Sequence, residues 1–311
     1  MKTVMVTGAS GMIGQAVCEA LLDKGHKVIG TDSKANSLSN PNFSFIQASI
    51  DDKSTITSNL RGVDVLVHLA CSADNDFPAV LSGAEEKLSS NTDKYLYKAA
   101  VDAGVGDIVL LSTHMIYDKQ KTREPIRESS DEHPVTVYGK LKHESEKTLT
   151  KVISKSVSAK YVIARVCPVY TKDYVENLKA KIYDPKDGCS FIYGYGDYGY
   201  SFCCLYNLVD FISCIVNIGQ GINYQGVYNV CDSKPIAAKD IVEFLRNGHK
   251  LGAVIQRNMG SETLKSINPF GNKGKNDYRY NDLSFACSNI SYDNTKAQRI
   301  SSFRWKLANT K

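Results

Sequence analysis

A tyrosine and a lysine four residues apart are the first side chains in this 311-residue chain whose spacing suggests chemistry. Tyr138 and Lys142 would share one face of a helix, because residues at i and i+4 are neighbours there. A nearby ammonium favours the phenolate and brings the pKa of Tyr138 down from about 10 towards working pH. Tyr138 could then take or return a hydroxyl proton while hydride moves at the same carbon. Thr113, at the end of a predicted strand, could hydrogen-bond the reacting oxygen, which predicts a catalytic set of Thr113, Tyr138 and Lys142.

The same spacing also occurs on ordinary helix surfaces, so the interpretation depends on a glycine motif near the N-terminus. Residues 7–14 read Thr-Gly-Ala-Ser-Gly-Met-Ile-Gly, between a predicted strand at 3–7 and a helix that should end near Gly25. The first glycine permits a tight turn, the second lets backbone approach a pyrophosphate, and the third allows close helix–strand packing. The helix N-terminus offers free N–H groups to the anion. We therefore expect a dinucleotide-binding loop made by Gly8, Ser10, Gly11, Met12, Ile13 and Gly14.

Asp32 ends the predicted second strand at 27–31 and is the acidic partner that such a loop needs. A carboxylate there can accept both ribose hydroxyls of an adenosine, and it repels a 2′-phosphate. This favours NAD over NADP as the cofactor. Lys34 is close enough in sequence to leave NADP open as the less favoured choice, and Asp32 could also be a solvated turn residue.

The elements that must position these residues alternate through the first half of the chain. Apolar runs at 3–7, 27–31, 43–48, 64–70, 107–112 and 161–166 are separated by helical patterns. Such alternation predicts βαβ units and a doubly wound parallel sheet with helices on both faces. The pattern breaks after about residue 170, where a glycine- and tyrosine-rich stretch begins. We expect one domain at 1–170 and a smaller substrate-binding lobe at 171–311, with part of 205–232 returning to the first domain.

Composition limits the class of protein. The chain is 42% hydrophobic and 23% charged with a net charge of +5, which fits a globular protein and gives no nucleic-acid signature. We expect no membrane span and no signal peptide, because no apolar stretch is long enough and the N-terminus lacks the layout. The nine cysteines form no CxxC pair, so we interpret them as reduced thiols of a cytoplasmic protein, and we expect Cys71 near the active site. Neither they nor the six histidines show metal-ligand spacing, so no metal site is expected.

With these motifs in place, the sequence resembles the extended short-chain dehydrogenase/reductase superfamily, and in particular the NAD-dependent epimerase/dehydratase family. Beyond the glycine loop and the Tyr–Lys pair, the similar segments are 67–70, 99–105, 137–139, 293–297 and 303–305. The resemblance implies a Rossmann fold, a nucleotide-activated sugar as substrate and a homodimer. It also implies that Ser49, Ile50, Leu69, Ala70, Tyr138 and Lys142 lie at the cofactor.

The resemblance extends to substrate recognition, with departures. Residues 279–282 resemble the family's Arg-x-Gly-Asp element, which implies that Arg279 grips a substrate diphosphate and Asp282 the nucleotide ribose. An arginine suits that task because its rigid fork bonds phosphate oxygens in pairs, although Arg279 could equally be a plain surface residue. Ser49 replaces an aspartate common near the adenine, Pro168 replaces an asparagine that contacts the nucleotide sugar, and Tyr200 stands in place of a second phosphate-binding arginine.

The residue after Thr113 bears on the type of reaction. In 4,6-dehydratases of this family an Asp-Glu pair stands where this chain has His114 and Met115, so water elimination is disfavoured. We assign His114 to the substrate site. The sequence therefore predicts an NAD-dependent epimerase that acts by transient oxidation at a ring hydroxyl of a nucleotide-activated sugar. Two alternatives stay open, an NAD(P)-dependent sugar ketoreductase or dehydrogenase and a non-catalytic dinucleotide-binding sensor.

Overall fold

The structure is a computed structural model of the chain, and it describes all residues except 72–82, 118–123, 185–188, 220, 249–250 and 258–289. Its centre is a seven-stranded sheet in the order β12-β6-β5-β4-β1-β2-β3, in which every neighbouring pair is parallel. This confirms the predicted Rossmann-like, doubly wound sheet. The strands are β1 (Thr3–Thr7), β2 (Lys27–Asp32), β3 (Phe43–Gln47), β4 (Val65–His68), β5 (Asp107–Thr113), β6 (Lys160–Val166) and β12 (Gly226–Val230).

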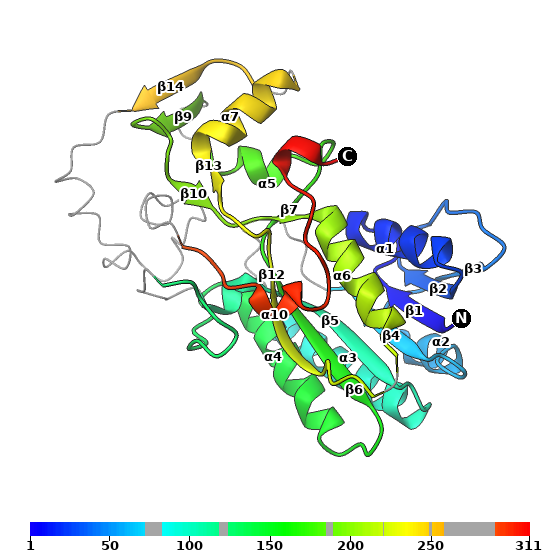
Figure 1. The fold of residues 1–311 in the computed structure, drawn as a ribbon. Coiled ribbons are helices and arrows are strands. Elements are labelled where there is room, and N and C mark those ends of the chain that lie inside the picture. Colours follow the sequence, from blue (N-terminus) through cyan, green and yellow to red (C-terminus); the bar gives the residue numbers. More distant parts are fainter. Residues whose placement is uncertain (72–82, 118–123, 185–188, 220, 249–250, 258–289) are drawn as a thin grey trace.

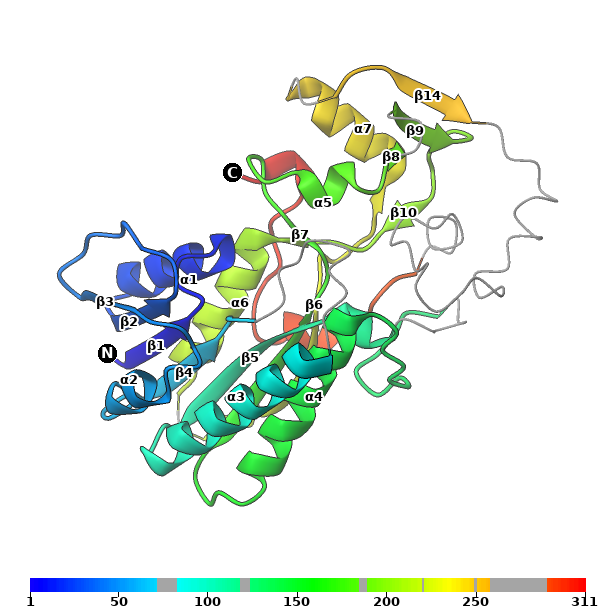
Figure 2. The same ribbon diagram turned by 180° about the vertical axis from the view of Figure 1, so that it is seen from behind.

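Helices cover both faces of the sheet. On one face lie α1 (Met12–Asp23) and α6 (Leu205–Asn217), and on the other α2 (Lys53–Ser58), α3 (Gly83–Asp102) and α4 (Val137–Ile153) (Figures 1 and 2). Side chains alternate along a strand, so neighbouring residues enter different cores. Val4 and Val6 pack with α1 and α6, whereas Met5 between them packs with α2, α3 and α4.

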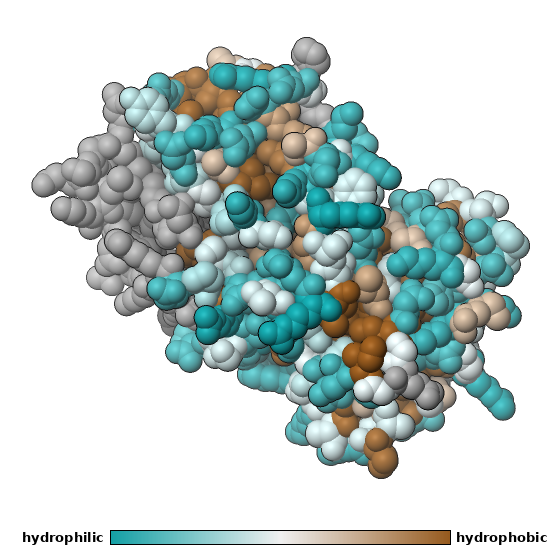
Figure 3. Space-filling view, viewed as in Figure 1, coloured by the Kyte–Doolittle hydropathy of each residue, from teal (hydrophilic) through white to brown (hydrophobic). Residues whose placement is uncertain are grey.

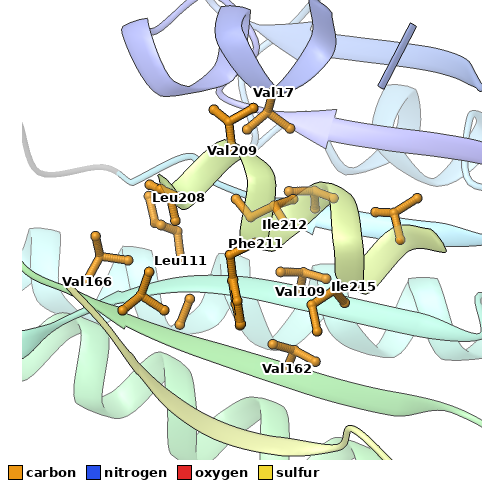
Figure 4. Close-up of a cluster of buried hydrophobic side chains, with 14 of the residues drawn as sticks. Val17, Val109, Leu111, Val162, Val166, Leu208, Val209, Phe211, Ile212 and Ile215 are labelled. Carbon is orange, nitrogen blue, oxygen red and sulfur yellow. The ribbon is translucent and has the colours of Figure 1, made fainter. Parts of the chain in front are cut away.

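The face covered by α6 shows how the second half of the chain completes the sheet. Buried α6 side chains such as Phe211 and Ile212 lie over Val109 of β5 and Val162 of β6, and Val17 of α1 packs beside them (Figure 4). The next strand, β12, pairs with β6 over Gly226–Val230. Residues 205–230 therefore contribute one helix and one strand to the Rossmann-like layer.

Helix ends follow local sequence signals. Helix α1 stops at Gly25, which has a φ of +77° and donates its N–H to Leu22 O, while His26 N–H donates to Leu21 O. This is the glycine-terminated helix end expected from the sequence. Helix α3 spans Gly83–Asp102 and ends just before Gly104, which has a φ of +84°.

A smaller lobe lies beyond the carboxyl ends of the sheet strands (Figures 1 and 2). Its core contains Tyr170, Leu178, Phe202, Ile241 and Leu245. Within it, β14 (Val254–Arg257), β9 (Cys189–Tyr193) and β8 (Tyr183–Asp184) form one sheet in that order. Its other elements are β7 (Val169–Tyr170), α5 (Glu176–Lys179), β10 (Gly199–Tyr200), β11 (Cys203–Cys204), β13 (Ile236–Ala237), α7 (Ala238–Asn247) and, near the C-terminus, η2 (Leu307–Asn309). Helix α10 (Thr295–Gln298) instead lies beside β12, and its Ala297 belongs to the core on the α1 and α6 face of the sheet.

The face of the molecule in Figure 3 is mainly hydrophilic, with apolar side chains in small patches. Within the described residues, none of the helices has the length and apolar character needed to cross a bilayer. The eight cysteines in these residues are free thiols, and Cys18, Cys167, Cys203, Cys204 and Cys231 are buried. Cys287 lies outside the described residues.

Candidate active site

Tyr138 is fixed at the start of α4 by tight packing. The hydroxyl oxygen of Thr136, the helix N-cap, accepts a hydrogen bond from Gly139 N–H at 3.0 Å. A side chain at Gly139 would bring its Cβ within 2.9 Å of Met115 O, so the glycine lets α4 approach the short helix η1 (His114–Tyr117) closely. Because η1 follows β5 directly, this contact holds Tyr138 beside the strand end that carries Thr113.

A cavity of about 450 Å³ lies where these elements meet. It is lined by Thr113 and His114 from the end of β5, by Tyr138, and by Met12 and Ile13 from the glycine loop. The opposite wall comes from the end of β6 and from the lobe: Val166, Cys167, Pro168, Val169, Tyr174, Glu176, Asn177 and Ala180. A crevice at the carboxyl ends of the strands is where ligands bind in open α/β sheets.

Thr113 presents a hydrogen-bond donor to this cavity. Its side chain is buried at 4% exposure, and its hydroxyl oxygen accepts a hydrogen bond from Met115 N–H at 3.2 Å. A hydroxyl has one hydrogen and two acceptor lone pairs. The Met115 contact uses one lone pair and leaves the hydrogen to donate to an oxygen in the cavity.

Lys142 lies behind Tyr138, one helical turn further along α4. The lysine is 3% exposed, and its Nζ lies 5.9 Å from the centroid of the Tyr138 ring. Burial lowers the pKa of Lys142, but the neighbouring Cys71, Tyr138, Asp93 and Glu146 raise it, and the net pKa is above the ordinary value. Lys142 is therefore a cation at neutral pH.

The pKa of Tyr138 shows a balance that the sequence could not give. Burial raises the pKa, Lys142 lowers it, Cys71 raises it, and the net pKa of Tyr138 is above its ordinary value. The expected direction of the Lys142 effect is confirmed, but the expected net shift towards neutral pH is wrong for the protein without ligands. The reason is desolvation, which outweighs one neighbouring cation when a phenol is buried.

The glycine loop has the backbone geometry that the sequence predicts. Gly8 has a φ of +75°, and a Cβ there would lie 2.9 Å from Ala70 N, so the loop packs directly against Leu69 and Ala70. A Cβ at Gly14 would lie 2.0 Å from Gly8 O, which excludes any side chain. The N-cap of α1 is Gly11, which has no side chain that could cover the backbone N–H groups of the first helical turn. The backbone around the start of α1 is thus open to a ligand, as a dinucleotide cradle requires.

Asp32 joins this loop to the residues after β2. Its Oδ2 accepts a hydrogen bond from Ser10 N–H at 3.0 Å, and its Oδ1 accepts one from Lys34 N–H at 3.0 Å. The Ser10 hydroxyl in turn donates to Lys34 O at 3.0 Å. An ionised carboxylate has about four acceptor sites, so these bonds leave capacity for ribose hydroxyls. The loop and Asp32 together fit a dinucleotide.

The remaining predicted residues do not line this cavity, and the cofactor role of Ser49 and Ile50 stays a prediction. Ser49 is exposed, and its hydroxyl accepts a hydrogen bond from Asp51 N–H at 3.2 Å. Ile50 packs at the edge of the core beneath α2 and α3. Tyr200 points into the lobe core, where its hydroxyl donates to Lys181 O at 3.1 Å. The two predicted substrate residues Arg279 and Asp282 lie outside the described residues.

The sequence reasoning missed a buried ion pair behind the site. Glu146 follows Lys142 by one helical turn and accepts hydrogen bonds from Arg165 Nε at 3.1 Å and Arg165 Nη2 at 2.7 Å. The Ser112 hydroxyl also donates to Glu146. Paired bonds between a guanidinium and a carboxylate are strong and directional. They tie α4 to β5 and β6 immediately behind Thr113 and Lys142, and the only sequence signal was the continued i+4 spacing.

The described residues include no group of three or more histidine, cysteine, aspartate and glutamate side chains placed to hold a metal ion. The groups that the structure brings together at this site are a buried phenol, a lysine, a threonine hydroxyl and a dinucleotide cradle.

This fold and site match a known class of proteins. The sequence matches the NAD dependent epimerase/dehydratase family over residues 4–231, so the chain belongs to that family. The family resemblance drawn from the motifs is confirmed.

Individual relatives are more distant. The chain is 30% identical over 187 residues to "Uncharacterized UDP-glucose epimerase YtcB" of Bacillus subtilis, which covers 54% of this chain and 56% of that protein. It is 26% identical over 147 residues to "Uncharacterized protein y4nG" of Sinorhizobium fredii, covering 46% and 35% of the two chains. The match thus spans about half or less of these curated relatives.

Solved structures share the fold over nearly the whole chain. UDP-glucose 4-epimerase from Thermotoga maritima, crystallised with UDP-glucose, has a TM-score of 0.70 at 19% identity, covering 96% of this chain and 91% of that one. UDP-glucuronic acid 4-epimerase from Bacillus cereus, crystallised with NAD, has a TM-score of 0.70 at 18% identity, covering 99% and 95%. A dTDP-glucose 4,6-dehydratase from Streptomyces venezuelae, with NAD bound, has a TM-score of 0.69 at 20% identity, covering 98% and 92%.

Proposed function

We propose that this protein is an NAD-dependent epimerase that inverts a ring carbon of a nucleotide-activated sugar by transient oxidation of its hydroxyl. The observation that carries the proposal is the cavity onto which Thr113, Tyr138 and the glycine loop converge, with the Lys142 cation behind the phenol. Membership of the family supports it, as do neighbours crystallised with UDP-glucose or NAD.

The dinucleotide would be held by residues whose geometry fits it. The backbone around Gly8 and Gly11 would take the pyrophosphate, Asp32 the adenosine ribose, and Lys142 the nicotinamide ribose. Bound NAD supplies a hydride acceptor and a positively charged ring, and the latter favours the Tyr138 phenolate. We choose NAD over NADP because Asp32 places a negative charge where a 2′-phosphate would lie.

The protein's own residues would handle the proton. Thr113 donates a hydrogen bond to the sugar oxygen and holds it next to Tyr138. Tyr138 as phenolate takes the hydroxyl proton while the carbon is oxidised, and gives it back after the sugar has turned over in the cavity. Lys142 stabilises the phenolate, which is essential because burial alone raises the pKa of Tyr138.

His114 supports an epimerase rather than a dehydratase. Its Nδ1–H donates to Val166 O at 3.1 Å, and burial together with the charge of Lys181 lowers the pKa of His114 to about 4. The ring is therefore neutral at working pH and provides no acid for water elimination. In the proposed reaction it positions the sugar by hydrogen bonding.

Our proposal also includes a homodimer located in the cytoplasm.

The test begins with the cofactor that the freshly purified protein carries, released by denaturation and identified by chromatography. The protein is then incubated with UDP-glucose, UDP-glucuronic acid or dTDP-glucose without added cofactor, and products are identified by NMR. Retained NAD and a C4-epimer would support the proposal. Stoichiometric consumption of NAD(P)H with reduction of a keto-sugar would show a ketoreductase instead. Cofactor binding without turnover of any of these sugars would contradict catalysis and favour the sensor.

A further inference from the structure

A second chain of buried hydrogen bonds, separate from the Glu146–Arg165 pair, leads towards Lys142. It begins at Thr7, the last residue of β1, whose Oγ1 lies 2.7 Å from His68 Nδ1 at the end of β4. His68 Nε2 lies 3.2 Å from Asp93 Oδ1 on α3. His68 is 2% exposed and the Asp93 side chain 14%. These three residues connect the start of the glycine loop to the helix that packs against α4.

The hydrogen atoms of these hydrogen bonds can be assigned. A carboxylate only accepts, so His68 Nε2 carries a hydrogen and donates it to Asp93. Thr7 Oγ1 accepts a hydrogen bond from Ala70 N–H at 3.3 Å, which leaves its own hydrogen to donate to Nδ1 when the ring is neutral. The histidine is thus held at both nitrogens, and it holds the Asp93 carboxylate in one orientation.

The packing of α3 on α4 places Asp93 next to Lys142. The Tyr97 hydroxyl on α3 lies 2.7 Å from the Ser145 hydroxyl on α4. Asp93 is one turn before Tyr97, and Lys142 is about one turn before Ser145. The two helices run side by side and lead into parallel strands, so the residues one turn back also face each other (Figure 2). Ser145 also donates a hydrogen bond to Asp93.

The charges in this cluster are complementary. Burial raises the pKa of Asp93, but the hydrogen bond and charge of His68, the Ser145 hydroxyl and the charge of Lys142 lower it, with a net pKa below the ordinary value. Asp93 is therefore an anion at neutral pH. The groups facing Lys142 are Cys71, Tyr138, Asp93 and Glu146. Glu146 is already bonded to the Arg165 guanidinium, so Asp93 is the carboxylate that best balances the lysine.

We propose that Asp93 is a positioning residue for Lys142, a carboxylate braced by His68 and Thr7 whose negative charge holds the ammonium in place behind Tyr138. Its importance for catalysis rests on the proposed function, but the electrostatic interaction between Asp93 and Lys142 does not. The same hydrogen bonds connect Thr7, the residue before Gly8, to the carboxylate near Lys142, the lysine that would hold the nicotinamide ribose. The cofactor loop and the Tyr138–Lys142 pair are thereby kept in a fixed position relative to each other.

The decisive experiment is a titration of Lys142 by NMR in protein carrying ¹³C-labelled lysine, with the signal assigned by its loss in Lys142→Arg. Asp93→Asn keeps the shape of the side chain and one acceptor oxygen but removes the charge. With burial retained and the anion lost, the titration midpoint of Lys142 should fall by about one pH unit.

Two further variants complete the design. Asp93→Glu restores the charge and should bring the midpoint back towards the native one. Asp102→Asn removes an exposed carboxylate at the end of the same helix and should leave it unchanged. A midpoint in Asp93→Asn that equals the native one would overturn the inference. The titration needs no substrate, so turnover assays that fail with every nucleotide sugar would overturn the proposed function alone.

Discussion

The two walls of the cavity are built in different ways. On the sheet side, the residues that would carry the chemistry are fixed by buried polar contacts, since Ser112 and Lys142, which neighbour Thr113 and Tyr138, face Glu146. On the lobe side, Tyr174 and Glu176 are exposed, and the Glu176 carboxylate pairs with Lys179 of its own short helix at 3.2 Å. The sheet wall is held by buried polar contacts, whereas part of the lobe wall consists of exposed side chains.

This difference separates chemistry from recognition. Buried polar networks specify one geometry, because any rearrangement leaves a polar group without a partner in a low dielectric. Exposed lobe residues are free to change with little cost to stability. A family built in this way can keep its proton- and hydride-transfer machinery while the lobe adapts to different sugars.

The largest expected effect on activity comes from removing the proton-transfer group of the sheet wall. Tyr138→Phe removes the hydroxyl that would take and return the proton, and kcat for sugar epimerisation should fall by about 10²- to 10⁴-fold. Bound NAD measured in the purified variant should stay at the native level, since the glycine loop is untouched. The matched change on the lobe wall, Tyr174→Phe, should alter kcat only a few-fold. Full activity of Tyr138→Phe on an identified substrate would show that the mechanism is wrong.

The second prediction compares stability on the two sides. Glu146→Gln removes the buried carboxylate partner of the Arg165 guanidinium, which is 2% exposed, and leaves it only the more exposed carboxylate of Glu132. Breaking a buried ion pair on one side costs roughly 3–5 kcal/mol, and because Glu132 remains we expect a loss of unfolding free energy of about 3 kcal/mol, measurable by urea denaturation.

Its counterpart in the lobe core is Tyr200→Phe, which keeps the ring beside the Lys181 ammonium and removes the hydroxyl that donates to Lys181 O. Loss of one such hydrogen bond costs about 1 kcal/mol. Equal losses in the two variants would contradict the contrast between a polar sheet wall and an apolar lobe core.

The sheet wall is also the part that the sequence predicts best. The strands appear as apolar runs, and the glycine loop and Tyr138–Lys142 are local patterns. Each can therefore be recognised from residues that are close together in the sequence. Thr113 was found because it ends such a run. The polar partners behind them were missed, since Glu146 meets Arg165 and His68 meets Asp93 only after the chain has folded.

Two further failures have physical causes. The spacing of Tyr138 and Lys142 gives the sign of their interaction but not the extent of burial, and burial decides the net pKa of Tyr138. In the lobe, strands as short as Tyr183–Asp184 and Gly199–Tyr200 leave too few residues for an alternation to be recognised. Their pairing with Cys189–Tyr193 and Ile236–Ala237 depends on tertiary contacts.

The last effect concerns His114, where the two walls meet. Its ring stands edge-on to Tyr292 at 5.6 Å, and its folded-state pKa is lowered to about 4 from the ordinary 6.5. Because the folded state binds this proton less readily than the unfolded state, the contribution to stability is complete above pH 6.5. It is lost as the pH falls from 6.5 to about 4. The loss should reach at most about 3 kcal/mol, measured by urea denaturation across that range.

Other groups titrate in the same range, so the prediction is a difference between variants. His114→Gln should flatten the pH dependence of the unfolding free energy relative to the native protein. His133→Gln, which changes an exposed histidine, should leave the native slope. If the His114→Gln protein loses as much stability as the native protein over this range, then His114 is not held neutral. Water would then reach its ring at the boundary between the two walls, despite the packing around it. In that case His114 could act as an acid towards the substrate, and the argument against water elimination would fail with it.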